Sequence, residues 1–199
     1  MEQLVTLQDI IRAEQRLKKV LNRMPLMRND VLSEQYGCNV YLKREDLQVV
    51  RSFKIRGAYN KMHSLSPEAL SRGVVCASAG NHAQGVAFSC RELRVRGCIF
   101  MPVTTPKQKI RQVQRFGGEF VEIVLAGDTF DDSAAAARAY CEEHDMAFIH
   151  PFDDAQVIAG QGSVALEILT DDVPEIDYIF GTIGGGGLMA GVGTYVKGT

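Results

Sequence analysis

A lysine at the start of an expected helix is the first residue in this sequence that could do covalent chemistry. Lys54 lies in the run 52–57, and if Ser52 caps the helix, Lys54 falls in its first turn. The positive end of the helix dipole, together with Arg51 and Arg56, disfavours a lysine cation there and favours a lowered pKa. A neutral amine can form a Schiff base with a carbonyl compound. A solvated surface lysine is the competing interpretation, and the spacing alone does not exclude it.

A turn of small and polar residues is the second feature that could bind a ligand. Its residues are Ser78, Ala79, Gly80, Asn81 and His82. The turn follows an expected buried strand and leads into a helix, so it lies where ligands bind in open α/β sheets. Small side chains let backbone N–H groups at the helix start face an anion such as a carboxylate. A plain connection with Asn81 in a left-handed conformation is an equal alternative.

Four consecutive glycines before an expected helix are the third feature. They are Gly184, Gly185, Gly186 and Gly187, followed by Leu188. Glycines at this position leave the backbone N–H groups unobstructed, and the helix dipole adds positive potential, so the run suits a phosphate group. Four glycines in a row are also costly in chain entropy, which disfavours a merely structural turn.

A dinucleotide-binding turn is an alternative for the same glycines. Gly185, Gly187 and Ala190 match that fingerprint. The fingerprint expects an acidic residue about twenty positions later and normally opens its fold, whereas several expected strands precede this turn. No Gly-Lys-Ser or Gly-Lys-Thr is present, which excludes a P-loop. The phosphate interpretation is therefore favoured.

Alternating strands and helices would hold these features in place. Strands are expected over 40–42, 74–77, 98–101, 120–125, 147–149 and 178–183. Helices are expected over 6–21, 52–65, 66–73, from the turn at 78–82 to Gly97, over 105–117, about 130–144 with Asp128 as its cap, over 163–169, and from 187 onward; 22–30 is expected to be a loop. Unbroken apolar strands are buried on both faces and are joined by right-handed helical crossovers. The sequence therefore predicts an α/β protein with largely parallel sheets.

Composition excludes several classes of protein. The chain has 199 residues, 46% of them hydrophobic and 23% charged, with a net charge of −2. That balance favours a packed globular core, with no nucleic-acid partner and no membrane span. The five cysteines form no Cys-x-x-Cys pair, and His63, His144 and His150 have no partner at metal spacing, so no metal site is expected. Buried thiols and the lack of a signal peptide indicate a cytoplasmic protein.

Three motifs together resemble one enzyme family. They are Lys-Arg-Glu-Asp at 43–46 with Ser-Phe-Lys-x-Arg-Gly at 52–57, Ser-Ala-Gly-Asn-His-Ala-Gln-Gly at 78–85, and the glycine run at 184–188. In this combination and order they closely resemble threonine dehydratase (threonine ammonia-lyase). That family uses pyridoxal 5'-phosphate and has the tryptophan-synthase-β-like fold (fold type II). One departure is Met24 before Pro25 and Leu26, where the family usually has threonine.

The resemblance implies two parallel-sheet α/β domains with the cofactor between them. Residues 53–152 would form a small domain, inserted into a large domain built from 1–52 and 153–199. The sequence stops at Thr199, shortly after the glycine run, so we expect the C-terminal part of the large domain to be missing. We also expect a homo-oligomer, since the family is typically oligomeric.

The resemblance also implies roles for individual residues. Lys54 would form the Schiff base with the cofactor and transfer protons. Asn81 would bond the ring oxygen of the cofactor, and Phe53 would pack near the ring. The substrate carboxylate would be held by Ser78, Ala79, Gly80, Asn81 and His82. The phosphate would be cradled by Gly184, Gly185, Gly186, Gly187 and Leu188.

The implied reaction is deamination of a small amino acid. L-Threonine would give 2-oxobutanoate and ammonia, as in isoleucine biosynthesis, and L-serine would give pyruvate. Serine racemase shares the three motifs, but there the residue before Gly80 is a serine that protonates the opposite face of the α-carbon, and Ala79 cannot do so. A catalytically silent α/β module is the other alternative. The preferred substrate, and the choice between a biosynthetic and a degradative form, stay open.

Overall fold

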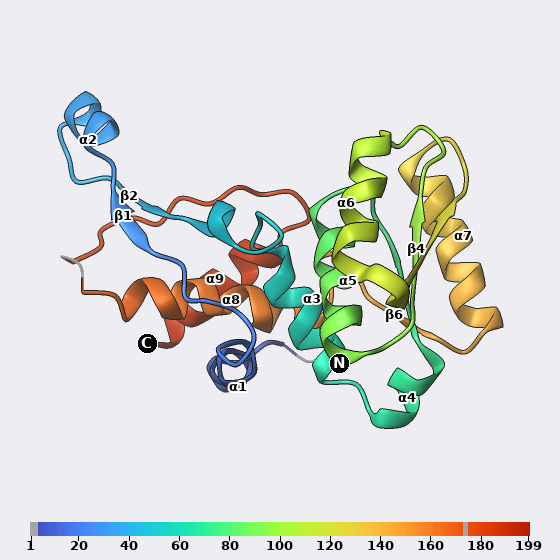
Figure 1. Ribbon diagram of the computed structural model, residues 1–199. Helices are drawn as coiled ribbons and strands as arrows, with labels where there is room; N and C mark the ends of the chain where they lie inside the picture. The colour runs from blue at the N-terminus through green and yellow to red at the C-terminus, as the bar shows by residue number, and fades with distance from the viewer. Residues whose placement is uncertain (1–3, 173–174) are drawn as a thin grey trace.

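A parallel sheet forms the centre of one half of the molecule. The computed structural model describes residues 4–172 and 175–199 (Figure 1). The sheet has the strand order β5-β4-β3-β6, and every neighbouring pair is parallel. Its strands are β3 (Val74–Ala77), β4 (Gly97–Met101), β5 (Val121–Leu125) and β6 (Ala147–Phe148). The predicted parallel α/β architecture is therefore confirmed.

Helices cover both faces of this sheet (Figure 1). On one face, α5 (Asn81–Leu93) and α6 (Lys107–Gly117) pack on Val74, Cys76, Ile99 and Met101. On the other face, α7 (Phe130–Glu143) packs on Val75, Ala77, Cys98 and Phe100. Successive residues of β3 and β4 thus alternate between two buried faces, which explains why these strands read as unbroken apolar runs.

A group of helices forms the other half of the molecule. It contains α1 (Leu7–Leu17), α3 (Lys54–His63), α8 (Ala155–Leu169) and α9 (Gly187–Gly198). Ile10 and Ala13 of α1 pack with Ala159 of α8 and Val192 of α9 in one apolar cluster. The backbone of α3 also lies close to α5 at Gly85, where an added Cβ would be 3.2 Å from the Ile55 nitrogen. The helix that starts with Lys54 therefore packs between the two halves.

An antiparallel hairpin near the N-terminus joins this helical group through buried charges. It pairs β1 (Leu26–Arg28) with β2 (Tyr41–Lys43) and carries α2 (Asp30–Tyr36), so the loop predicted over 22–30 is wrong after Pro25. Three short elements complete the described chain. They are the 3₁₀ helix η1 (Glu45–Leu47), the helix α4 (Pro67–Arg72) and the 3₁₀ helix η2 (Gly118–Phe120). Buried Arg56 of α3 donates to Glu45 at 2.7 Å and to Glu167 at 2.8 Å, which fixes the hairpin's exit against α3 and α8.

Three sequence predictions need correction. Residues 178–183 are not a strand, because no extended segment of the described chain lies beside them to accept their backbone hydrogen bonds; Tyr178 and Phe180 are 80% and 92% exposed. Thr129, not Asp128, caps α7, since its hydroxyl accepts from the Asp132 N–H. The eighth helix begins at Ala155 rather than near residue 163.

The helices of the described chain are too short or too polar to cross a bilayer. Among residues 4–172 and 175–199, none combines the length and the apolar character that a membrane-spanning helix needs. The prediction of buried thiols is confirmed for four of the five cysteines; all five are free, and Cys38 is exposed.

Candidate active site

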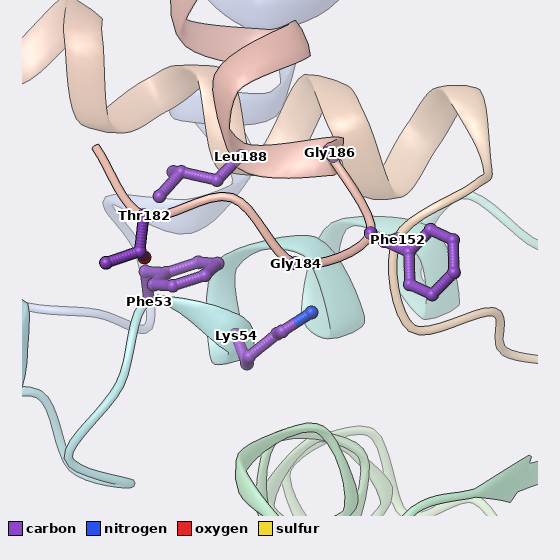
Figure 2. Close-up of a pocket in the computed structure, with 9 residues that line it drawn as sticks. Phe53, Lys54, Phe152, Thr182, Gly184, Gly186 and Leu188 are labelled. Carbon is purple, nitrogen blue, oxygen red and sulfur yellow. The ribbon is translucent and has the colours of Figure 1, made fainter. Parts of the chain in front are cut away.

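One pocket brings together residues from three distant segments. It has a volume of about 100 Å³ and lies between the start of α3, the end of β6 and the start of α9 (Figure 2). Its lining consists of Phe53, Lys54, Phe152, Thr182, Gly184, Gly185, Gly186, Gly187 and Leu188. Thr182, Gly184 and Gly185 are exposed, so the pocket opens to solvent on that side.

Lys54 is the lining residue whose amine could act as a nucleophile. It is the first residue of α3, and its backbone N–H donates to the Ser52 hydroxyl at 3.2 Å. The amine donates to the Pro151 carbonyl at 2.6 Å and lies 5.6 Å from the centre of the Phe53 ring. Figure 2 shows the side chain directed beneath the glycine turn, between the Phe53 and Phe152 rings.

Burial lowers the pKa of the Lys54 amine, in the direction that the sequence predicts but for a different reason. The sequence predicts this shift from the helix dipole and from the nearby arginines. In the structure Arg56 is neutralised by Glu45 and Glu167, and the cost of removing the lysine cation from water is the cause that remains. A larger share of neutral amine at a given pH follows, which favours attack on a carbonyl.

The glycine turn presents free N–H groups to the same pocket. Gly186 has φ +85°, a left-handed conformation that favours glycine, and α9 then begins at Gly187. The first backbone bond of this helix within the described chain runs from the Ala190 N–H to the Gly186 carbonyl at 2.9 Å. The preceding N–H groups of the first turn therefore remain available to an anion.

Close packing on Phe152 holds the glycine turn in place. A Cβ added at Gly187 would lie 2.6 Å from the Phe152 carbonyl oxygen, and one at Gly185 would overlap the Phe152 ring. The segment that carries Phe152 is itself ordered by His150, whose Nδ1 accepts from the backbone N–H groups of Phe152 and Asp153. A larger residue at Gly185 or Gly187 would therefore displace the pocket floor.

Two lining residues, Phe152 and Thr182, were not predicted from the sequence. Phe152 follows the strand predicted over 147–149, so the rule that ligands lie at the carboxyl ends of strands could have identified it. Thr182 precedes the glycine run, and no signal in the sequence marks it as a lining residue.

The turn 78–82 lies beside the pocket but does not line it. Gly80 donates its N–H to the Ser78 hydroxyl at 3.2 Å, Asn81 is exposed, and Ala79 is half-buried. His82 is 3% exposed, and its Nε2 is 2.9 Å from the Ile149 carbonyl. The structure thus brings Phe53, Lys54 and the glycine turn together, and among the described residues a hydrogen bond from His82 to Ile149 links the second turn to the segment beneath them.

A second hollow, of about 240 Å³, lies on α6, away from these residues. It is lined by Gln108, Arg111, Gln112 and Arg115. It is larger than the Lys54 pocket, but it holds no nucleophile, and all four residues sit on one helix. The chemistry of the groups, rather than the volume, therefore identifies the Lys54 pocket as the candidate active site.

Comparison with known sequences adds independent information. Residues 17–199 match the sequence model of the family described as "Pyridoxal-phosphate dependent enzyme". The chain is 60% identical over 193 residues to the biosynthetic L-threonine dehydratase IlvA of Halalkalibacterium halodurans, and 59% identical over 194 residues to that of Bacillus subtilis. These matches cover 97% and 98% of this chain and 46% of each relative, so the chain spans about half the length of these relatives.

Solved structures share the fold. The processed form of threonine deaminase isoform 2 from Solanum lycopersicum aligns with a TM-score of 0.89 at 44% identity, over 96% of this chain and 55% of the other. Maize serine racemase aligns with a TM-score of 0.92 at 33% identity, over 98% of this chain and 58% of the other.

Proposed function

This chain belongs to the family of pyridoxal-phosphate dependent enzymes, and on that premise we propose that it is a lyase that deaminates L-threonine to 2-oxobutanoate and ammonia. One observation carries the proposal. A half-buried lysine amine with a lowered pKa lies in the same pocket as a helix start with free N–H groups. Few ligands other than a phosphorylated carbonyl compound need both groups at once.

The residues of the pocket fit this cofactor. The glycine turn at 184–187 lacks Cβ atoms where a phosphate would approach, and Leu188 continues the row of N–H groups. Phe53 offers an apolar surface beside the Lys54 amine, against which an aromatic ring can pack. When bound, the cofactor supplies an electron sink for the bond that breaks at the α-carbon.

Lys54 then acts on the substrate as a base. Its neutral amine removes the α-proton of threonine, and the Pro151 carbonyl keeps this amine oriented when it is free. The β-hydroxyl leaves as water after it takes up the proton that the Lys54 amine removed from the α-carbon. The resulting enamine tautomerises and takes up one water molecule, giving 2-oxobutanoate and ammonia, so the water released is balanced by the water consumed. L-Serine would give pyruvate and ammonia by the same steps.

We assign the substrate carboxylate to the turn 78–82. The turn lies at the carboxyl end of β3, and α5 begins there at Asn81, so its N–H groups can bind an anion. The exposed Asn81 side chain is free to reach the ring oxygen of the cofactor. The close approach of Gly85 to the backbone of Lys54 and Ile55 supports this assignment, because it fixes α5 against the lysine helix.

Racemisation of serine is the second candidate, and the similarity to maize serine racemase favours it as an alternative. It requires an acid on the face of the α-carbon opposite the lysine. Ala79, the residue at which the resemblance expects a serine in racemases, has no proton to donate. We therefore expect Ala79→Ser to raise the ratio of D-serine to pyruvate by about tenfold. An unchanged ratio would contradict the role given to this position.

The organisation of the working enzyme is also a proposal. We infer a small domain over 53–152, supported by the parallel sheet that lies within it, and a large domain over 1–52 and 153–199. The name of the relatives supports a biosynthetic rather than a degradative form. A cytoplasmic location is supported by the buried free thiols, which suit a reducing compartment, and a homo-oligomer is carried over from the family resemblance.

Trapping the cofactor tests the assignment directly. The protein is incubated with pyridoxal phosphate, reduced with borohydride and digested, and the labelled peptide is identified by mass spectrometry. The label is expected on Lys54. Lys43 and Lys61 are internal controls, because each is held by a carboxylate, Glu167 at 2.8 Å and Asp154 at 2.7 Å.

A label on either control lysine, or none in the folded protein, would contradict the assignment. Lys54→Ala should abolish both the label and the release of 2-oxobutanoate from threonine. A protein that takes the label on Lys54 but releases no product would support the silent module instead.

A further inference from the structure

His82 is the only imidazole of the described chain that is fully buried and bonded to the segment beneath the pocket. It is 3% exposed and is the second residue of α5, and Lys54 and His150 are near enough to act electrostatically on its ring. Its Nε2 is 2.9 Å from the carbonyl oxygen of Ile149. Because a carbonyl oxygen only accepts, the Nε2 atom must carry the proton and donate it.

The other ring nitrogen has no partner. Burial lowers the pKa of His82 to about 4. The hydrogen bond to Ile149 raises this pKa, whereas the charges of Lys54 and His150 lower it further. The ring is therefore neutral at pH 7. With its one proton on Nε2, the Nδ1 atom is a bare acceptor, and it is buried without a donor in the described part of the chain. A buried acceptor without a partner is destabilising, and an apolar ring of similar size would avoid it. The Nε2–H donor to the Ile149 carbonyl is therefore the polar interaction that explains a histidine at this position.

The segment that His82 holds supports both halves of the pocket. The Ile149 N–H donates to the Val75 carbonyl at 2.8 Å, which fixes the segment to β3. Two residues later, the Pro151 carbonyl accepts from the Lys54 amine, and Phe152 lies against the glycine turn. A shift of the Ile149 carbonyl would thus displace both Pro151, which accepts from Lys54, and Phe152, which packs on the glycines.

We propose that His82 is a positioning residue: its imidazole N–H fixes residues 149–152 through the Ile149 carbonyl and thereby sets the environment of the Lys54 amine. This role rests on the proposed function only in that Lys54 is the reactive amine. It differs from the role that the family resemblance gives to this turn, which concerns the substrate carboxylate. The role also explains how a turn that does not line the pocket controls a group within it.

The test measures the Lys54 amine in the cofactor-free protein, independently of catalysis. Trace acetylation with acetic anhydride, followed by mass spectrometry of the Lys54 peptide over a range of pH, gives the titration midpoint of this amine. His82→Phe keeps a ring but removes the donor, and we expect it to raise the midpoint by about half a unit or more as the amine becomes more solvated. His82→Gln keeps an N–H donor of similar reach and should restore most of the shift.

His144→Phe is the matched control. That ring also bonds a backbone carbonyl, of Tyr140 at 3.0 Å, but it is exposed at the C-terminal end of α7, away from the pocket. It should leave the Lys54 midpoint unchanged. Amide hydrogen exchange at Phe152 and Asp153 should quicken about tenfold in His82→Phe alone. A folded His82→Phe protein with an unchanged midpoint and unchanged exchange would overturn the proposal.

A measurement on the unaltered protein covers the case in which His82→Phe does not fold. Long-range ¹H–¹⁵N NMR of the imidazoles reports which nitrogen carries the proton. The expected result for His82 is the Nε2–H tautomer, and the Nδ1–H tautomer would overturn the proposal by itself. Failure of the borohydride label to reach Lys54 would contradict the proposed function, whereas the coupling between His82 and the Lys54 midpoint is read without cofactor.

Discussion

Two turns of small residues precede helices in this molecule, and they are held in different ways. The turn 78–82 follows a fully buried strand and is fixed by hydrogen bonds, from Ser78 to the Phe100 carbonyl and from Gly80 to the Ser78 hydroxyl. The turn 184–187 follows an exposed segment that is not a strand, and contact with Phe152 fixes it. Similar sequence signals thus give one turn positioned by directional bonds and one positioned by shape.

The difference predicts which changes should destabilise each turn. Hydrogen bonds depend on protonation state and on single polar atoms, so the first turn should respond to pH and to loss of a donor or acceptor. Close packing depends on volume, so the second turn should respond to the addition of a methyl group. The four predictions that follow test this contrast, in order of decreasing effect on stability.

The largest effect is expected from pH, acting on the hydrogen-bonded turn. The pKa of His82 falls to about 4 in the folded protein, from an ordinary value of 6.5. Between these values the unfolded chain binds the proton and the folded chain does not, so stability is full above about pH 6.5 and is lost as the pH falls. The loss should approach about 3 kcal/mol by pH 4. Urea unfolding of the native protein and His82→Gln at pH 7 and pH 4.5 measures it.

In that experiment the variant should lose much less stability on acidification. Some dependence will remain, because burial also lowers the pKa of His150. Equal acid sensitivity in both proteins would mean that His82 is not the group responsible.

The next largest effect is expected from Gly187→Ala, which tests the packed turn. The new Cβ would lie 2.6 Å from the Phe152 carbonyl oxygen, so the backbone must move. We expect a loss of about 1–3 kcal/mol in the free energy of unfolding, with weaker binding of pyridoxal phosphate. Chemical denaturation and fluorescence titration measure the two quantities.

Gly193→Ala is the matched control on the same helix. Nothing lies within 4 Å of its added Cβ, so the change should instead stabilise α9 by about 0.5–1 kcal/mol. Equal changes in the free energy of unfolding for Gly187→Ala and Gly193→Ala would contradict the role of close packing on Phe152.

A smaller effect is expected from Ser78→Ala in the hydrogen-bonded turn. The variant leaves the Gly80 N–H without its acceptor at 3.2 Å, and a loss of about 1 kcal/mol should follow. Ser71→Ala is the comparison, because that hydroxyl donates to a backbone carbonyl on the exposed helix α4. If the two variants lose the same stability, the Ser78 bond has no special weight in the turn.

The smallest effect on stability is expected from Gly184→Ala. Its Cβ meets nothing within 4 Å, so the free energy of unfolding should change by less than about 0.5 kcal/mol. The methyl group would nevertheless project from a residue that lines the pocket, so binding of inorganic phosphate or of the cofactor should weaken. Isothermal titration calorimetry of the folded variant measures the affinity separately from the stability. An unchanged affinity would mean that phosphate does not bind next to Gly184.

Much of the fold around the first turn could be predicted from the sequence. The strand at 74–77 has the predicted bounds because four apolar residues in a row are buried on both faces, and Ser66 with Pro67 marks the start of α4 through an ordinary cap. These signals are local, so one chain is enough to read them.

The parts that failed depend on neighbours far away in the chain. Residues 178–183 are as apolar as the true strands, but a strand also needs a partner, and the described chain supplies none there. The sequence pattern predicts the start of α8 near residue 163, whereas Asp154 caps the helix and it begins at Ala155. Phe152 packs on glycines more than thirty residues later; its place after a predicted strand marks it as a candidate lining residue, but the sequence does not show this contact.

The strand order also has a consequence for the time course of folding. β6 is the last of the four strands along the chain, yet it pairs with the first, β3, through Ala147 and Phe148 only. Closing so long a loop for two residue pairs is entropically slow, so β6 should dock after β3, β4 and β5 have assembled. The segment that receives the Lys54 amine follows β6 directly and arrives with it. Until then we expect Lys54 to be solvated, so its amine should acquire the lowered pKa late in folding.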